Sequence, residues 1–113
     1  MSSITTHILD TARGTPAAGV EISLTKQDSD QWKTIGSGKT NADGRIPDLC
    51  IDHPSLSEGT YKMRFDTNQY FSNTGDAVFY PYAEVVFIID HNKQHYHIPL
   101  LLSPFGYSTY RGS

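Results

Sequence analysis

Short segments in which apolar and polar residues alternate recur along this chain, and they restrict its fold more than any other feature. In one of them Val20, Ile22 and Leu24 are separated by single polar residues, so an extended chain places all three on one face. The pattern predicts about eight short strands, among them residues 4–9, 20–25, 32–36, 59–66, 83–89, 95–102 and 107–110. Strands at this spacing are typical of an antiparallel sandwich or barrel.

Turn residues separate the strands. Glycine and proline mark residues 10–19 as a loop, and residues 41–44 (Asn-Ala-Asp-Gly) predict a tight turn immediately before Arg45. Residues 90–93 predict a hairpin turn that joins the strands on either side of them.

One short helix is predicted, at residues 67–72, with Asp66 or Thr67 as its N-cap and an Asn-Thr-Gly end. The strand predicted at residues 83–89 is apolar on both faces around a single Glu84, so we expect it to be buried on both sides.

The length and charge of the chain limit its class. The 113 residues are enough for one domain, predicted to span residues 1–113, with a small core. A net charge of −3 does not favour nucleic acid or an anionic membrane as a partner. Charged residues make up only 19%, which suggests that some surface is covered by another subunit. Neither a signal core nor a membrane-spanning run is present, so we expect a soluble, cytoplasmic protein, or a periplasmic one if a signal peptide has been removed.

The single cysteine, Cys50, excludes an internal disulfide and a Cys-x-x-Cys zinc motif. We interpret it as a small buried apolar residue.

Two of the five histidines lie on one predicted strand face. His95 and His97 are two residues apart and alternate with the apolar side chains that should face the core, so both imidazoles should point outward. From spacing alone, two solvated or interface histidines are more usual than a catalytic pair. A zinc site needs three or four ligands, of which His7 could be a third, but nothing in the spacing requires a metal. We therefore predict no metal and no cofactor.

His7 and Arg45 complete a set of residues capable of chemistry. Taken singly, His7 is a polar residue on a sheet face and Arg45 a solvated cation after a turn. Together, however, two neutral imidazoles and a guanidinium suffice to activate water, because one imidazole can take its proton while Arg45 holds a carbonyl or anionic oxygen. No nucleophile elbow, P-loop or dinucleotide fingerprint is present.

Both ends of the chain carry family signatures. Residues 6–14 (THILDTARG) with 16–20 (PAAGV) resemble the N-terminal signature of the transthyretin-like family, and residues 95–113 (HYHIPLLLSPFGYSTYRGS) look like its C-terminal signature. Residues 40–45 (TNADGR) extend the likeness through the middle. The ending Tyr-Arg-Gly-Ser is similar to that of the enzymatic branch of this family rather than that of the thyroid-hormone carrier.

The resemblance implies an all-β, prealbumin-like sandwich of two four-stranded antiparallel sheets with one short helix. It also implies a homotetramer, a dimer of dimers, whose sites line a channel between the dimers. The implied reaction is the hydrolysis of 5-hydroxyisourate to 2-oxo-4-hydroxy-4-carboxy-5-ureidoimidazoline, a step of urate degradation.

The family's catalytic positions fall on His7, Arg45, His97 and Ser113. By this resemblance, His7 and His97 activate water, Arg45 binds the substrate oxygen, and the terminal serine closes the pocket. Tyr110 is expected to contact the substrate together with His7, Arg45 and Ser113. His95 and Arg111 are expected to support the site.

Two other functions compete with hydrolysis. One is a non-enzymatic carrier of a small aromatic ligand in the same channel, and the other is a plain β-sandwich interaction module. The joint presence of His7, Arg45, His97 and the Tyr-Arg-Gly-Ser ending favours the hydrolase, because a carrier does not need these residues.

Overall fold

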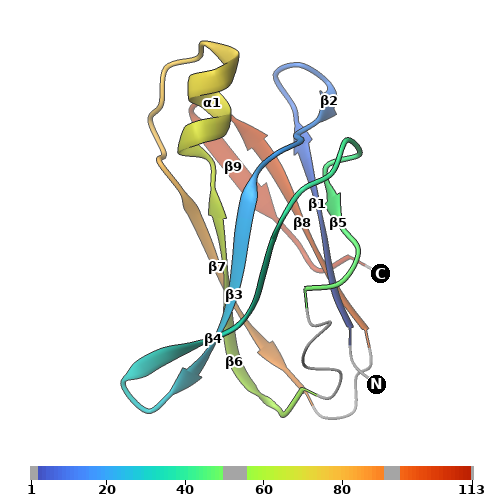
Figure 1. The fold of residues 1–113 in the computed structure, drawn as a ribbon, viewed down its shortest axis with the longest axis vertical. Helices are drawn as coiled ribbons and strands as arrows, with labels where there is room; N and C mark the ends of the chain where they lie inside the picture. Colours follow the sequence, from blue (N-terminus) through green and yellow to red (C-terminus); the bar gives the residue numbers. More distant parts are fainter. Residues whose placement is uncertain (1–2, 50–55, 91–94, 113) are drawn as a thin grey trace.

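Two β-sheets lie face to face (Figure 1), and buried apolar side chains fill the space between them. The computed structural model describes residues 3–49, 56–90 and 95–112. The first sheet has the order β2-β1-β8-β9, with β5 also paired to β1, and the second has the order β4-β3-β6-β7. The strands are β1 (Ser3–Asp10), β2 (Thr15–Pro16), β3 (Glu21–Asp28), β4 (Gln31–Lys39), β5 (Arg45–Ile46), β6 (Gly59–Asp66), β7 (Ala83–Ile89), β8 (His95–Ser103) and β9 (Gly106–Thr109).

The predicted sandwich with one short helix is confirmed. The first sheet has five strands rather than four, because β5 pairs with β1 beside β2. Neither β2 nor β5 was predicted, since two residues are too few to show an alternating pattern.

Strand pairing departs from the sequence predictions in two ways. β1 and β8 are parallel, whereas every other pair among the described strands is antiparallel. The predicted β7–β8 hairpin is wrong, because β7 pairs with β6 in the second sheet and β8 with β1 and β9 in the first. Residues 91–93 of the predicted turn at 90–93 lie outside the described residues. A turn signal shows only where a strand ends, not which strand the next one joins.

The composition of β7 predicts burial on both sides, but the structure shows only one buried face. The strand lies at the edge of the second sheet, with Ala83 and Ile89 buried on one face. On the other face Val86 is 58% and Ile88 73% exposed. Apolar residues on both faces of a strand therefore do not establish burial within one chain.

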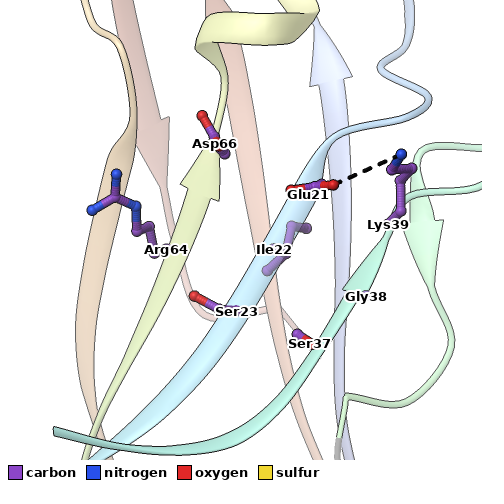
Figure 2. Close-up of a pocket in the computed structure, with 8 residues that line it drawn as sticks. All are labelled: Glu21, Ile22, Ser23, Ser37, Gly38, Lys39, Arg64 and Asp66. Carbon is purple, nitrogen blue, oxygen red and sulfur yellow. Dashed lines mark ion pairs between the residues drawn. The ribbon is translucent and has the colours of Figure 1, made fainter.

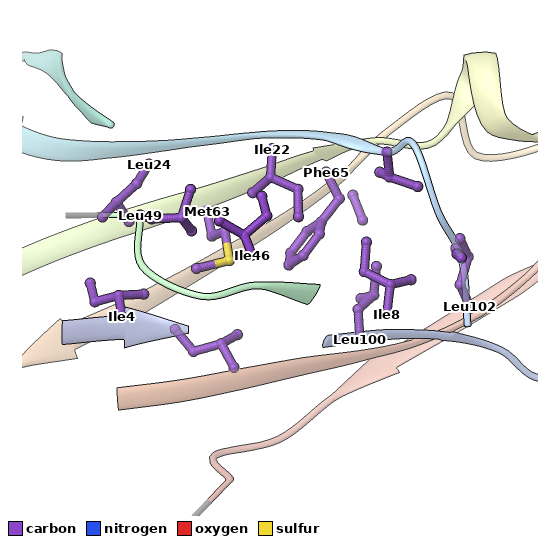
Figure 3. Close-up of a cluster of buried hydrophobic side chains, with 14 of the residues drawn as sticks. Ile4, Ile8, Ile22, Leu24, Ile46, Leu49, Met63, Phe65, Leu100 and Leu102 are labelled. Atoms are coloured by element: carbon purple, nitrogen blue, oxygen red, sulfur yellow. The ribbon is translucent and has the colours of Figure 1, made fainter. Parts of the chain in front are cut away.

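The core is formed by side chains from both sheets (Figure 3). Ile46 reaches it from β5, and Leu49 reaches it from the segment that follows β5. On β4, a Cβ at Gly36 would lie only 1.9 Å from the Leu49 carbonyl oxygen, so only glycine allows this segment to lie so close. This packing anchors β5. The labelled members of the cluster are Ile4, Ile8, Ile22, Leu24, Ile46, Leu49, Met63, Phe65, Leu100 and Leu102.

A short helix, α1 (Asn68–Thr74), follows β6. Thr67 occupies the N-cap position but makes no capping bond with its side chain, and its hydroxyl donates instead to the Tyr80 carbonyl at 3.1 Å. Gly75 ends the helix in the left-handed conformation, with φ 81°, as the Asn-Thr-Gly sequence predicts. No helix among the described residues has the length and apolar character needed to cross a bilayer.

A buried carboxylate ties β1 to this helix. Asp10, the last residue of β1, is fully buried, and its Oδ1 accepts the backbone N–H groups of Ala12 and Arg13, both at 3.1 Å. Its Oδ2 accepts the Tyr70 hydroxyl of α1 at 2.6 Å and the Arg13 guanidinium at 3.3 Å. Burial and the bond to this carboxylate raise the pKa of Tyr70 to about 12, so the phenol keeps the proton that it donates.

Candidate active site on the outer face of the first sheet

The outer face of β1 carries the first predicted site residue. Ile4, Thr6, Ile8 and Asp10 are buried, while the residues between them are only half-buried. The alternation thus turns His7 outward, as predicted.

A tight turn places Arg45 directly opposite His7. The turn at residues 41–44 is closed by the Gly44 N–H, which donates to the Asn41 carbonyl at 2.9 Å. Gly44 has φ 72°, and a Cβ there would lie 2.6 Å from the Ile8 carbonyl oxygen, so the turn requires glycine. His7 and Arg45 are then partners in the β1–β5 register and share one face of the sheet.

The parallel pairing of β1 with β8 places His97 beside Thr5. The Thr5 Oγ1 lies 2.8 Å from Nδ1 of His97 and 3.5 Å from Nε2 of His95. His97 is half-buried and His95 is exposed, whereas Tyr96 and Ile98 between and after them face the core. The predicted outward direction of both histidines is therefore confirmed.

The C-terminal segment lies against His97. The Gly112 N–H donates to the His97 carbonyl at 2.8 Å. A Cβ at Gly112 would lie 2.5 Å from Cδ2 of the His97 ring, so the backbone of the tail is in close contact with the imidazole. The remaining tail residue predicted to be catalytic, Ser113, lies outside the described residues.

Tyr110 and Arg111 line a different hollow from the one that Arg45 lines. Tyr110 is 58% exposed, and the Arg111 guanidinium lies 5.0 Å from the centre of the Tyr96 ring. Both border a mostly apolar hollow of about 230 Å³ between β7 and β8, which His97 also lines. Tyr110 is thus not brought together with Arg45, although His97 lies beside both.

A second hollow, of about 320 Å³, contains the Arg45 and His97 side chains in its wall. His7 lies next to it, as the strand partner of Arg45. The lining residues are Thr5, Thr6, Asn41, Arg45, Ile46, Pro47, His95 and His97.

The surroundings of His7 and His97 favour the neutral imidazole, because they lower the pKa of both side chains. Burial lowers the pKa of His97 from its ordinary 6.5, and the charges of Arg45, His95 and His7 lower it further. Burial and the charge of Arg45 likewise lower the pKa of His7, while hydrogen bonding to the Asp43 backbone and the charge of Asp43 act in the opposite direction. A neutral imidazole can accept a proton from water, and the Arg45 guanidinium on the same sheet face can hold an anionic oxygen.

Nearly the whole chain matches one known family. The model of the HIUase/Transthyretin family covers residues 4–112. The chain belongs to this family. The likeness of the two terminal segments to the transthyretin-like family is thereby confirmed.

Relatives in the HIUase/Transthyretin family extend over the full chain. The "5-hydroxyisourate hydrolase" of Mus musculus is 47% identical over 114 residues, covering 99% of this chain and 96% of the mouse protein. The protein of the same name from Deinococcus radiodurans is 42% identical over 113 residues, covering 97% and 95%.

Solved structures of both branches of the family superimpose on this chain. The Klebsiella pneumoniae 5-hydroxyisourate hydrolase is 38% identical, with a TM-score of 0.87 and coverage of 100% of both chains. A sea bream transthyretin, solved in complex with thyroxine, is also 38% identical, with a TM-score of 0.90 and coverage of 97% and 94%. The family fold alone therefore does not distinguish a hydrolase from a carrier.

Two contacts of His97 in this family member were not predicted from the sequence. Thr5 shares the outer face of β1 with His7, but only the parallel β1–β8 register brings its hydroxyl to His97. The sequence predicts no contact for Gly112, whereas its lack of a side chain is what allows the tail to contact the ring. Among the described residues, no three His, Cys, Asp or Glu side chains cluster as metal ligands would.

A further hollow, of about 400 Å³, lies on the outer face of the second sheet (Figure 2). Two carboxylates and two cations line it, so its charges balance. Glu21 and Lys39 form an ion pair at 3.8 Å, while Arg64 lies 3.7 Å from Glu84 and 3.8 Å from the centre of the Tyr82 ring. None of the predicted site residues lines this hollow.

Proposed function

We propose that this protein hydrolyses 5-hydroxyisourate to 2-oxo-4-hydroxy-4-carboxy-5-ureidoimidazoline in urate degradation. One observation carries the proposal: three separate strands bring His7, Arg45 and His97 to one face of the first sheet. Relatives named 5-hydroxyisourate hydrolase, 42–47% identical to this chain, support the same reaction.

In the proposed mechanism the two neutral histidines activate water. One imidazole accepts a proton from water as its oxygen bonds to the carbonyl carbon of the substrate ring. Arg45 stabilises the negative charge that develops on the carbonyl oxygen. The carbon–nitrogen bond of the ring then breaks, and the imidazolium returns its proton to the departing nitrogen. We place Tyr110 and Ser113 at the substrate and His95 and Arg111 in support of the site.

We further propose that the chain forms a homotetramer, a dimer of dimers, with its sites between subunits. Large apolar side chains on the described surface support this assembly, among them Ile88 at 73%, Phe105 at 67% and Phe79 at 63% exposure. β7 also forms a sheet edge with apolar side chains on its outer face.

Ultraviolet monitoring of freshly prepared 5-hydroxyisourate tests the reaction. With pure protein at neutral pH we expect decay well above the spontaneous rate. Decay at the spontaneous rate, together with saturable binding of thyroxine, would replace the hydrolase by the carrier function that the sea bream structure represents.

The His97→Asn variant tests the role of the imidazole. Loss of general acid–base help should lower kcat by about two to four powers of ten. The matched His95→Asn variant, at the exposed neighbouring histidine, should lower it much less. Near-normal turnover by His97→Asn would remove His97 from the mechanism.

A further inference from the structure

The Thr5 hydroxyl lies between the two histidines of β8. Its oxygen is 2.8 Å from Nδ1 of His97 and 3.5 Å from Nε2 of His95. Thr5 and His97 are register partners on adjacent parallel strands, so the backbone ladder fixes the shorter contact. Since both side chains are only half-buried on the same sheet face, the contact lies at the candidate active site.

A hydroxyl has one proton, so Thr5 can donate a hydrogen bond to only one of the two imidazoles. If Thr5 donates to His97, then Nδ1 of His97 carries no proton and its Nε2 does. If instead Nδ1–H of His97 donates to Thr5, the hydroxyl proton is free to point toward Nε2 of His95. In this second arrangement Nε2 of His97 keeps its lone pair.

The backbone of Thr5 favours the second arrangement. Hydrogen bonding between His97 and the Thr5 backbone raises the pKa of the imidazole, against the larger effect of burial. The acceptor in a backbone is the carbonyl oxygen, which can only receive a proton. Nδ1 is the ring nitrogen that lies within hydrogen-bond distance of Thr5, 2.8 Å from its Oγ1, so we assign the proton that His97 donates toward Thr5 to Nδ1.

We propose that Thr5 is a positioning residue that holds His97 in the Nδ1–H tautomer, so that Nε2 is the nitrogen that accepts a proton from water. This inference rests on the proposed hydrolase function and assigns the atom that acts in it. Because the same hydroxyl faces Nε2 of His95, the orientation of His95 is coupled to the tautomer of His97. His95 then acts through Thr5 and does not touch the substrate.

The charged groups around His97 come from three strands and the tail. His7, Arg45 and His95 lie close enough to influence its pKa. Arg111 faces the Tyr96 ring on the other side of β8. None of these is removed when Thr5 is changed, so substitution of Thr5 isolates the hydroxyl.

Thr5→Val and Thr5→Ser form the test pair, because valine matches the shape of threonine without a hydroxyl and serine keeps the hydroxyl. The control is Thr25→Val, at a half-buried threonine on β3 whose hydroxyl donates to the Lys62 carbonyl. In protein with ¹⁵N-labelled histidine, at a pH where both imidazoles are neutral, nitrogen shifts report the tautomer. We expect Nδ1–H for His97 in wild type, Thr5→Ser and Thr25→Val, and a mixture of tautomers in Thr5→Val.

Turnover gives the second readout. Thr5→Val should lower kcat by roughly tenfold or more with a smaller change in KM, as loss of a partner that orients a histidine usually does. Thr5→Ser and Thr25→Val should remain close to wild type. An unchanged tautomer in Thr5→Val, or a changed tautomer with unchanged kcat, overturns the proposal. If the wild-type protein does not hydrolyse 5-hydroxyisourate, the proposed function is overturned instead. The nitrogen shifts would still decide whether Thr5 orients His97.

Discussion

His97 is held at two points by atoms that carry no charge, the Thr5 hydroxyl and the Gly112 backbone. Its reactivity therefore depends on fine placement as well as on electrostatics. Displacement of a reacting group by about 1 Å can cost about 100-fold in rate.

Gly112→Ala tests the contact between the tail and the ring. The added Cβ would lie 2.5 Å from Cδ2 of His97, so the ring or the tail must move. We expect kcat/KM to fall by about 100-fold while circular dichroism stays unchanged. The control is Gly106→Ala, where the new Cβ meets only the Ser103 Oγ at 3.8 Å. Equal activity of the two variants would contradict a role for this contact.

Arg45→Gln tests the electrostatic coupling on the same face. Burial and then the positive charge of Arg45 lower the pKa of His97, since both disfavour the imidazolium. Removal of the charge should therefore raise the pKa of His97, measured by NMR titration, and move the acidic limb of kcat/KM to higher pH. Arg64→Gln, on the second sheet, should leave the titration unchanged. If the pKa of His97 is the same in Arg45→Gln as in wild type, the charge of Arg45 does not influence His97.

Among the elements, those with a clear pattern were predicted and those set by distant partners were not. Alternation was sufficient for β3 and β6, and the Asn-Ala-Asp-Gly turn was sufficient to place Arg45 after a tight turn. The parallel β1–β8 pair could not be predicted, because no connecting turn dictates the direction of strands so far apart in sequence. For the same reason Thr5 could not be linked to His97.

The link between β1 and α1 gives a prediction for stability. Tyr70→Phe removes the 2.6 Å hydrogen bond to the buried Asp10 carboxylate, and we expect a loss of about 1–3 kcal/mol in the free energy of unfolding. Urea denaturation measures this value. Tyr107→Phe, at an exposed ring of β9, is the control and should cost much less. Equal midpoints for both variants would show that the Tyr70 hydrogen bond contributes nothing.

At the scale of the whole molecule, several large aromatic rings among the described residues are exposed to solvent on the isolated chain. The ring centres of Phe79 and Phe105 lie 6.3 Å apart, and those of Tyr80 and Tyr107 lie 5.3 Å apart. The Phe79 and Tyr80 rings, whose centres are 4.8 Å apart, join the two pairs into one group. Such a group of apolar rings on a surface usually marks an interface.

Light scattering tests whether the proposed tetramer covers these rings. We expect a mass near four times the 12.6 kDa of one chain. Phe79→Asp should lower the mass and the activity together, because a buried charge at an interface is costly. Thr34→Asp, at an exposed position of β4, should change neither. A monomer mass for the active wild-type protein would contradict a site between subunits.

Because Gly112 contacts His97, different parts of the chain form the core and complete the candidate site. The described core extends no further than Leu102, whereas the contact on the imidazole is supplied by the tail beyond β9. A protease that trims the chain after Tyr110 would leave the sandwich folded and remove that contact. Limited proteolysis at this end would therefore inactivate the protein while producing no unfolded chain for quality control to detect.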